Sequence, residues 1–231
     1  MYKYPEKPVK GKFIRRYKRF LTDVELDDGQ IVTAHCTNTG SLASCLIPGA
    51  EVLLTPSNNP HRKTRFTWES IRIGDIWVGV NTSVPNKLIY NALKENLIPE
   101  LTGFHTVKPE VKFQQSRFDL YLENEREKMF AEIKNVTYRE GDFALFPDAP
   151  TQRGLKHLKE LVSAVEQGYR AAIIFAIARP DARIFAPAAH VHPDYALMLK
   201  QAVDTGVEIY PLIIHYSEEG ARVAGMMQYE L

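Results

Sequence analysis

The sequence predicts an α+β/α/β protein with two domains, an N-terminal OB-like β-barrel over residues 1–82 and a C-terminal α/β domain over residues 83–231. Two observations carry this prediction. The first part of the chain consists of short β-rich runs separated by turn residues, without helical periodicity. From about residue 84 onward, amphipathic helices alternate with apolar strands, which is typical of a central sheet covered by helices.

Composition limits the class of protein. The chain has 231 residues, 45% hydrophobic and 25% charged, with a formal net charge of +1, as in soluble globular proteins. No run approaches the roughly 18 consecutive apolar residues of a membrane-spanning helix, and no apolar run follows the basic N-terminus as in a secretory signal. Cys36 and Cys45 are too few for a zinc site. We therefore expect a cytoplasmic protein with free thiols and no membrane partner.

The β-rich runs of the N-terminal part are separated by turn signals such as Asp27–Gln30, Pro48–Gly49 and Gly74. The runs are Phe13–Phe20, Thr22–Leu26, Ile31–Cys36, Ala50–Leu54, Phe66–Ile73 and Asp75–Val80. About five strands at this spacing favour a small barrel, and an OB-type barrel would offer an open face to an oligonucleotide.

The C-terminal part alternates between the two periodicities. Apolar residues recur at helical spacing in three segments, Asn86–Leu97, Thr151–Gln167 and a helix that opens at Pro193 and ends near Gly206. Strands are expected at Arg117–Glu123, Lys128–Val136, Arg170–Ala178 and Val207–Ile214. The last two are continuous apolar runs, as in strands that are buried on both faces.

Basic residues are segregated although the net charge is small. The first 20 residues contain eight lysines and arginines against the single acid Glu6, and a second group lies at His61–Arg65. Segregated charge permits a phosphate-binding face on a nearly neutral molecule. The residues that we expect to contact nucleic acid from this part are Arg15, Arg16, Lys18, Arg19, Arg62 and Lys63.

Three polar residues are expected to meet on the hairpin formed by strands 117–123 and 128–136. Asp119 lies between Phe118 and Leu120, and side-chain alternation places it on the face opposite to theirs. Glu132 and Lys134 share one face of the second strand by the same rule. A turn near Glu125 brings Asp119 directly across from Glu132.

Such a trio suits metal-assisted phosphodiester chemistry. Two adjacent carboxylates repel each other unless a cation lies between them, and Mg²⁺ or Mn²⁺ prefers such oxygen ligands. We expect Asp119, Glu132 and the main-chain carbonyl of Ile133 to bind the metal, and Lys134 to orient the attacking water or to stabilise the charge that develops. The pattern is similar to the PD-(D/E)xK nuclease superfamily, although Phe118 replaces the usual proline. Acids and lysines also alternate on strands that simply face water.

The predicted helix 151–167 adds further candidates for nucleic-acid contacts. Gln152, Arg153, Lys156 and His157 lie in its first two turns, where main-chain N–H groups at a helix N-terminus attract phosphate. The alternative is an amphipathic helix with a solvated basic face. Glu95 and Glu100, at the end of the preceding helix, are candidates for one more metal ligand or for surface ion pairs.

Longer motifs spread along the chain carry a family resemblance. They are Cys36–Ser41, Leu46–Ala50, Arg117–Asp119, Glu132–Thr137, Phe146–Thr151 and Arg153–Leu158. In these stretches the sequence resembles the sugar fermentation stimulation protein A family (SfsA). The resemblance implies an OB-like N-terminal domain, a nuclease-like C-terminal domain, sequence-independent DNA binding and a regulatory link to sugar (maltose) metabolism.

Two functional hypotheses follow from the sequence. The first is a DNA-binding protein with a Mg²⁺-dependent nuclease site. The second is a non-catalytic DNA-binding regulator that keeps the nuclease fold as a scaffold. DNA as the partner is common to both, and the sequence leaves open whether the chain forms a homo-oligomer and whether it prefers DNA or RNA.

Overall fold

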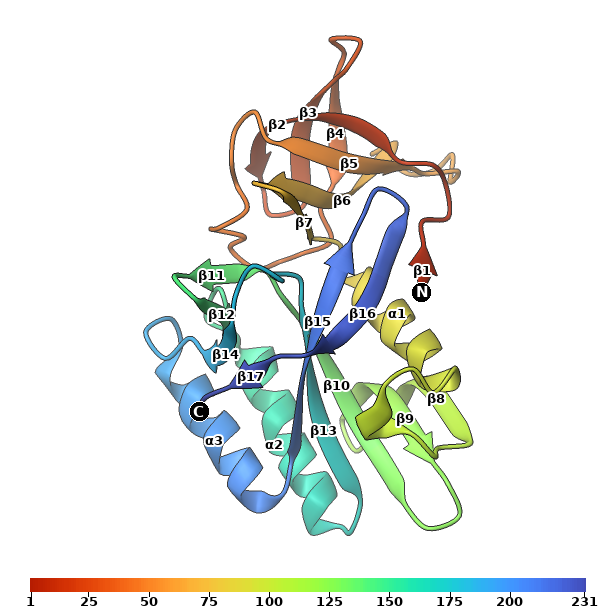
Figure 1. Ribbon diagram of the computed structural model, residues 1–231, viewed down its shortest axis with the longest axis vertical. Helices are drawn as coiled ribbons and strands as arrows, with labels where there is room; N and C mark the ends of the chain where they lie inside the picture. The colour runs from red at the N-terminus through yellow and green to blue at the C-terminus, as the bar shows by residue number, and fades with distance from the viewer.

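Five strands of the N-terminal part close into a barrel in the computed structural model, which describes residues 1–231 (Figure 1). These strands are β2 (Val9–Tyr17), β3 (Leu21–Leu26), β4 (Ile31–His35), β5 (Glu51–Pro56) and β6 (Phe66–Ile73). β2 pairs with β3 and β5, β3 pairs with β4, and β5 pairs with β6, all antiparallel. A parallel pairing between β4 and β6 closes the ring, which confirms the predicted OB-like barrel.

The sheet of the C-terminal part continues directly from the barrel. β7 (Ile76–Gly79) pairs with β6 on one side and with β15 (Glu208–Tyr216) on the other. The order then runs β15, β13 (Arg170–Ile177), β10 (Lys128–Val136), β9 (Ser116–Glu123) and β8 (Thr106–Phe113). β10, β13 and β15 are parallel, and β8 and β9 are antiparallel additions at the edge. The predicted α/β domain is confirmed.

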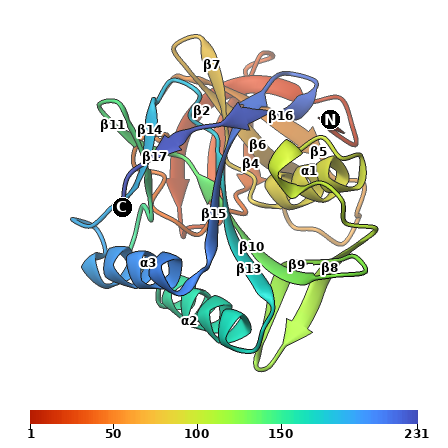
Figure 2. The ribbon, with the colours of Figure 1, turned by 60° about the horizontal axis from the view of Figure 1, so that its bottom comes forward.

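The helices cover the two faces of this sheet. α2 (Gln152–Glu166) and α3 (Pro193–Thr205) lie together on one face, and α1 (Ser83–Lys94) lies on the other (Figure 2). The Thr151 side chain caps α2 by accepting a hydrogen bond from the main chain of Gly154 at 3.0 Å. α3 starts with Pro193 and stops at Gly206, which has a left-handed φ of 111°. A short 3₁₀ helix, Pro99–Leu101, follows α1.

Two apolar clusters correspond to the two faces. Alternate residues of β13 divide between them, with Ile173 and Phe175 packing toward α2 and α3, and Ile174 toward α1. The cluster on the α1 side extends without interruption into the barrel, where it includes Phe13 and Trp68. The barrel and the α/β part therefore share one core.

Several strands lie outside the predicted elements. β1 (Tyr2–Lys3) pairs with β16 (Gly220–Met226), which is antiparallel to β15. A separate sheet contains β11 (Tyr138–Glu140), β12 (Phe143–Phe146), β14 (Ile184–Pro187) and β17 (Gln228–Tyr229). These strands are short or contain glycine and proline, so their hydrophobic periodicity is weak. α1 also begins three residues before the predicted start at Asn86.

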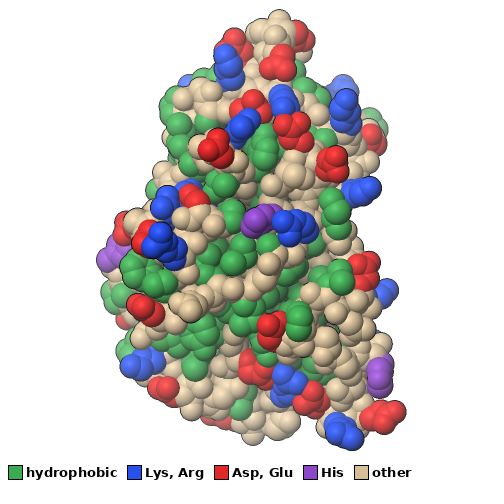
Figure 3. All heavy atoms as spheres, viewed as in Figure 1, with side chains coloured by type: hydrophobic (Ala, Val, Ile, Leu, Met, Phe, Trp, Pro, Cys, Tyr) green, Lys and Arg blue, Asp and Glu red, His purple; other side chains and the backbone are tan.

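The face of the molecule that Figure 3 shows bears no single large field of one sign. Acidic and basic side chains are interspersed on the face shown in Figure 3, as expected for a net charge of +1. None of the helices is both long and apolar enough to cross a membrane. On this face a phosphate-binding surface would be local, and the site described next is a candidate for one.

Candidate metal and nucleic-acid site

Asp119 and Glu132 lie where the β9–β10 hairpin opens toward the rest of the molecule. Register pairs run from Lys128 and Glu123 at the turn to Ala131 and Leu120, and Asp119 and Glu132 are the next residues of the two strands. At this step the Asp119 carboxylate accepts a hydrogen bond from the main-chain N–H of Ile133 at 2.8 Å. The expected juxtaposition of the two acids is present.

The alternation assumed for β9 is wrong in one respect. Phe118, Leu120 and Leu122 were expected to point to the same face, but Phe118 packs with the α2 cluster, whereas Leu120 and Leu122 pack with the α1 cluster. β8 changes faces at the same level, beside Glu110, which has a φ of 55°. Asp119 therefore lies at the point where the apolar side chains of β9 change from the α1 face of the sheet to the α2 face.

Glu132 is held by two donors on the α2 side of the sheet. Its Oε1 accepts a hydrogen bond from the Lys134 amine at 2.6 Å and another from Nδ1 of His157 on α2. Nε of Arg153 donates a hydrogen bond to Nε2 of the same imidazole at 3.4 Å. Burial acts to raise the pKa of Glu132, but the His157 hydrogen bond and the Lys134 charge together outweigh it, so the pKa is lowered.

Asp119 has a different environment from Glu132. Its Oδ1 accepts a hydrogen bond from the Asn86 side chain of α1 at 2.8 Å. Burial, and then the charge of Glu132, raise the pKa of Asp119 from 3.8 to about 6. The two carboxylates thus repel each other through a medium of low polarity, and a cation between them would relieve the repulsion.

One carboxylate oxygen of the pair has no partner. Oε2 of Glu132 is buried and makes no hydrogen bond, which costs free energy unless something outside the chain satisfies it. No set of three or more His, Cys, Asp or Glu side chains forms a complete metal cage. Two carboxylates and the neighbouring main chain of Ile133 fit Mg²⁺, which typically takes one or two protein carboxylates and fills the rest of its shell with water and phosphate.

These residues form the floor of a polar pocket of about 470 Å³ between the barrel and the α/β part. The α/β part contributes the strand residues 132–135 and the segment Phe146–Pro150, together with Arg153 of α2. The barrel part contributes Arg19 and residues 37–40. The pocket is therefore completed by residues from both halves of the chain.

Residues 37–40 of the pocket belong to a segment that we call the bridging loop, Thr37–Cys45. Arg16 donates hydrogen bonds to its carbonyls at Asn38, Gly40 and Ser41, at 2.6, 2.8 and 3.2 Å. The loop is also tied to the α/β part, because the N–H of Leu42 donates to the Asp148 carboxylate at 2.8 Å.

Two further contacts fix the bridging loop. The Ser44 hydroxyl donates to the Thr137 carbonyl at 3.0 Å. A Cβ at Gly40 would lie only 2.2 Å from Oδ1 of Asp148, so the backbone approaches this carboxylate as closely as only glycine permits. The loop is consequently a fixed wall of the pocket.

The basic residues expected on the barrel have different surroundings. Arg19 lines the pocket, and Lys18 beside it is exposed; both have positive φ in the β2–β3 turn. Arg15 forms an ion pair with Asp23 at 2.9 Å and lies over the Tyr17 ring. Arg16 has a structural role, since its guanidinium is committed to the bridging loop.

The remaining expected contacts are spread over two surfaces. Arg62 donates to the Thr64 and Thr67 hydroxyls, next to exposed Lys63. On α2, Gln152 is exposed at the first position, and Lys156 pairs with Glu160 at 3.7 Å without lining the pocket.

Sequence reasoning missed the partners of the two acids. His157 was grouped with the basic side chains of the helix, but it is buried and faces the sheet with Leu158 and Leu161. Its position on the apolar side of α2 was a signal that it has a buried polar partner. Asn86 was placed at the start of the helix without a role. Glu95 and Glu100 lie at the far end of α1 and do not reach the pocket.

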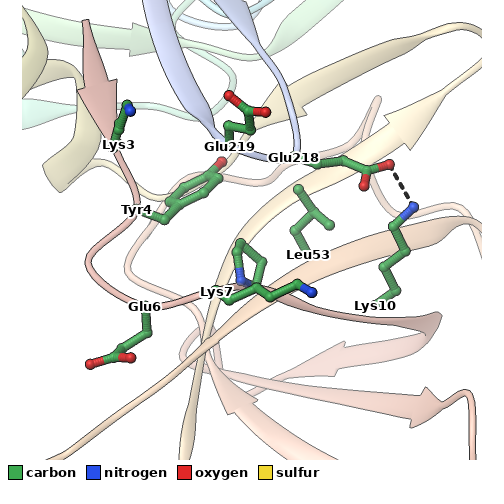
Figure 4. A pocket seen from close by; sticks show the side chains of 9 residues that line it. Lys3, Tyr4, Glu6, Lys7, Lys10, Leu53, Glu218 and Glu219 are labelled. Atoms are coloured by element: carbon green, nitrogen blue, oxygen red, sulfur yellow. Dashed lines mark hydrogen bonds and ion pairs between the residues drawn. The ribbon is translucent and has the colours of Figure 1, made fainter.

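A second hollow lies where the β1–β2 segment meets the β15–β16 turn (Figure 4). Its charges neutralise each other, because Lys10 reaches Glu218 on one side and Glu51 on the other. Glu6 and Glu219 also line the hollow, which lies apart from Asp119 and Glu132. It serves as a contact between the N-terminal segment and the last hairpin.

Comparison with known proteins supports the two-part description. Residues 83–220 match the model of the sugar fermentation stimulation protein RE domain, and residues 14–80 match that of the SfsA N-terminal OB domain. The sugar fermentation stimulation protein homolog of Geotalea uraniireducens is 45% identical over 94% of this chain and 95% of its own length. The homolog of Trichodesmium erythraeum is 48% identical over 91% of this chain and 86% of its own.

A solved structure gives the same result in three dimensions. SfsA of Pyrococcus furiosus, determined in complex with Ca²⁺, superposes with a TM-score of 0.91 at 31% identity and covers 100% of this chain and 98% of its own. The two family models together cover both the barrel and the α/β part, and the relatives and this structure each span both parts. The chain belongs to the sugar fermentation stimulation protein (SfsA) family.

Proposed function

We propose that this protein binds DNA without sequence preference and hydrolyses phosphodiester bonds with Mg²⁺ or Mn²⁺ at Asp119, Glu132 and Lys134. The observation that carries the proposal is the buried, unpartnered Oε2 of Glu132 beside an Asp119 carboxyl with a raised pKa. Such an arrangement is costly unless a cation completes it. The Ca²⁺ in the P. furiosus relative supports a divalent cation at this site.

Each residue has a distinct role in the proposed reaction. Asp119, Glu132 and the Ile133 carbonyl hold the metal, which when present polarises the phosphate and lowers the pKa of a bound water. His157 fixes the orientation of Glu132 through the hydrogen bond from Nδ1. Lys134 donates to Glu132 in the resting site and places its positive charge where negative charge develops during the reaction.

The DNA backbone is held by basic groups around this floor. Arg19 and Arg153 line the pocket, and Lys18, Gln152 and Lys156 lie on the adjoining surface. Arg15, Arg62 and Lys63 extend the basic surface of the barrel. Arg16 acts indirectly by fixing the bridging loop. We assign residues 1–82 mainly to this binding role and residues 83–231 to the chemistry.

The test is a cleavage assay on oligonucleotides with Mg²⁺ or Mn²⁺. Asp119→Asn and Lys134→Ala are expected to lose cleavage by at least about a hundred-fold, the scale of removing one preorganised electrostatic group. Glu125→Gln, an exposed acid in the hairpin turn of the same two strands, is the matched control and is expected to keep wild-type activity. Wild-type protein that binds DNA but cleaves none with either metal would exclude the nuclease.

That outcome would favour the second function, a non-catalytic DNA-binding regulator of sugar metabolism. The name shared by the relatives favours it, as does the Lys134 amine, which is already engaged by Glu132. Both functions require salt-sensitive DNA binding, because phosphate contacts release counterions.

A further inference from the structure

The fixed bridging loop restricts what can reach the floor of the pocket. It is tied to the barrel through Arg16 and to the α/β part through Asp148 and Thr137. The pocket of about 470 Å³ that it borders falls in the range of small-ligand sites, roughly 300–1,000 Å³. A space of this volume holds a short stretch of one strand, whereas a double helix can only lie across its mouth.

An aromatic and basic strip on the barrel leads to this pocket. Arg19 lines the pocket, and the next residue, Phe20, stacks on His35 with ring centroids 6.3 Å apart and an interplanar angle of 12°. His35 is followed by Cys36 and then by Thr37, which again lines the pocket. Phe20 and His35 are therefore each close in the chain to a residue that lines the pocket, Arg19 and Thr37 respectively.

The strip ends in a further cation. His35 is the register partner of Thr67, and the Arg62 guanidinium donates to the Thr67 hydroxyl at 3.1 Å. Burial and then the nearby Arg62 charge lower the pKa of His35, which favours the uncharged ring. We call Arg19, Phe20, His35 and Arg62 the barrel strip.

Phe20 differs from the aromatic residues that form the barrel core. Phe13 and Trp68 stack on each other in the interior and are 3% and 0% exposed. Phe20, by contrast, is 47% exposed. An exposed phenylalanine stacked on a half-buried histidine and flanked by arginines is an arrangement on which bases of a single strand stack while the cations follow the backbone.

We propose that the barrel strip binds single-stranded DNA by stacking bases on Phe20 and His35, and that it feeds one strand past Arg19 to the carboxylates of the pocket. This inference rests on the proposed function and narrows its substrate to unpaired DNA, such as a free strand, a flap or a frayed end. Duplex DNA contacts only the outer basic surface.

The experiment measures binding separately from cleavage. A fluorescently labelled oligo(dT) and a blunt hairpin duplex of the same nucleotide count are titrated with the full-length protein in EDTA, so that no cleavage occurs. Wild-type protein is expected to bind oligo(dT) at least tenfold more tightly than the duplex. Phe20→Ala is expected to weaken oligo(dT) binding roughly five- to a hundred-fold, the scale of losing one stacked base, with little change for the duplex.

Ile31→Ala is the matched control, since Ile31 is an apolar side chain of the same barrel that is 66% exposed but lies outside the strip. It is expected to bind like the wild type, and thermal melts check that both variants are folded. Equal affinity for the two probes, or equal effects of Phe20→Ala and Ile31→Ala, would overturn this inference and leave the proposed nuclease intact. If neither probe binds, the proposed function falls and takes this inference with it.

Discussion

Glu69 in the barrel and Glu132 in the pocket are equally buried, each 3% exposed, yet their surroundings are opposite. Both oxygens of Glu69 are satisfied by neutral donors, the Thr55 hydroxyl at 2.5 Å and the Asn81 amide at 2.8 Å. Glu132 takes its donors on one oxygen only, from Lys134 and His157, and leaves the other bare.

The pKa values of the two groups differ accordingly. Burial raises the pKa of Glu69 despite its hydrogen bonds, whereas the His157 hydrogen bond and the Lys134 charge lower the pKa of Glu132 against the same effect of burial. A buried carboxyl with complete neutral partners serves the structure. A buried carboxyl with a lowered pKa and one oxygen free is what the proposed metal site requires. Burial alone does not distinguish these two environments; the hydrogen bonding of the two carboxyls does.

The largest expected effect is a difference between variants of Glu132, which should lose cleavage, and variants of Glu69, which should lose stability. Glu132→Gln is expected to reduce cleavage by at least about a hundred-fold while the protein stays folded. Glu69→Ala is expected to lower the free energy of unfolding by about 1–3 kcal/mol, because Thr55 and Asn81 keep buried groups without a partner, and to leave cleavage within a few-fold of wild type. Urea denaturation and the cleavage assay on both variants measure this. If both variants lose cleavage and stability to the same extent, the proposed difference between Glu132 and Glu69 is wrong.

A smaller effect is expected at His157, which touches Glu132 but not the phosphate. His157→Ala is expected to reduce cleavage roughly ten- to a hundred-fold, as outer partners of metal ligands do. Removing its hydrogen bond also raises the pKa of Glu132, so the acid limb of the pH–rate profile is expected to move to higher pH. An activity loss at every pH without that displacement would show that His157 acts on folding rather than through Glu132.

The smallest expected effect concerns stability against pH in the metal-free protein. Asp119 has its pKa raised from 3.8 to about 6 in the folded state, so the folded state binds an extra proton between these values. The stability that this proton provides is complete below about pH 4 and is lost as the pH rises through about 6.

Thermal melts between pH 4 and 8 measure this effect. In Asp119→Asn this part of the decline is expected to disappear, and in the wild type added Mg²⁺ or Ca²⁺ is expected to raise the melting temperature more above pH 6 than below it. A wild type and an Asp119→Asn variant with parallel profiles, neither responding to metal, would mean that Asp119 is not strained by Glu132.

The sequence predicted the fold class and the trio of side chains because both depend on regular periodicities. The turn near Glu125 fixed the hairpin register, and the apolar runs at 170–178 and 207–214 correspond to β13 and β15. The edge strand β8 escaped prediction because Lys108, Pro109 and Glu110 interrupt its pattern. The same irregular place reverses the face of Phe118, which simple alternation cannot foresee.

The sequence also did not predict which barrel residues line the pocket. The contact between Leu42 and Asp148 joins residues 106 positions apart, and no local pattern predicts such a separation. Arg16 illustrates the converse, since its place in a basic cluster predicted a phosphate contact and its hydrogen bonds show that it holds the bridging loop. Which cations face a ligand and which serve the protein itself is decided by tertiary contacts.

The pairing of β1 with β16 has a consequence for how the molecule comes apart. Tyr2 and Lys3 pair with Ala221 and Gly220 close to the other end of the chain, and β7 joins β15 in the same region. Together with the shared apolar cluster, these links leave no boundary along which one half could melt while the other stays ordered. Denaturation should accordingly be a single cooperative event, and a fragment cut between β7 and α1 would expose the part of the shared apolar cluster that the other half covers.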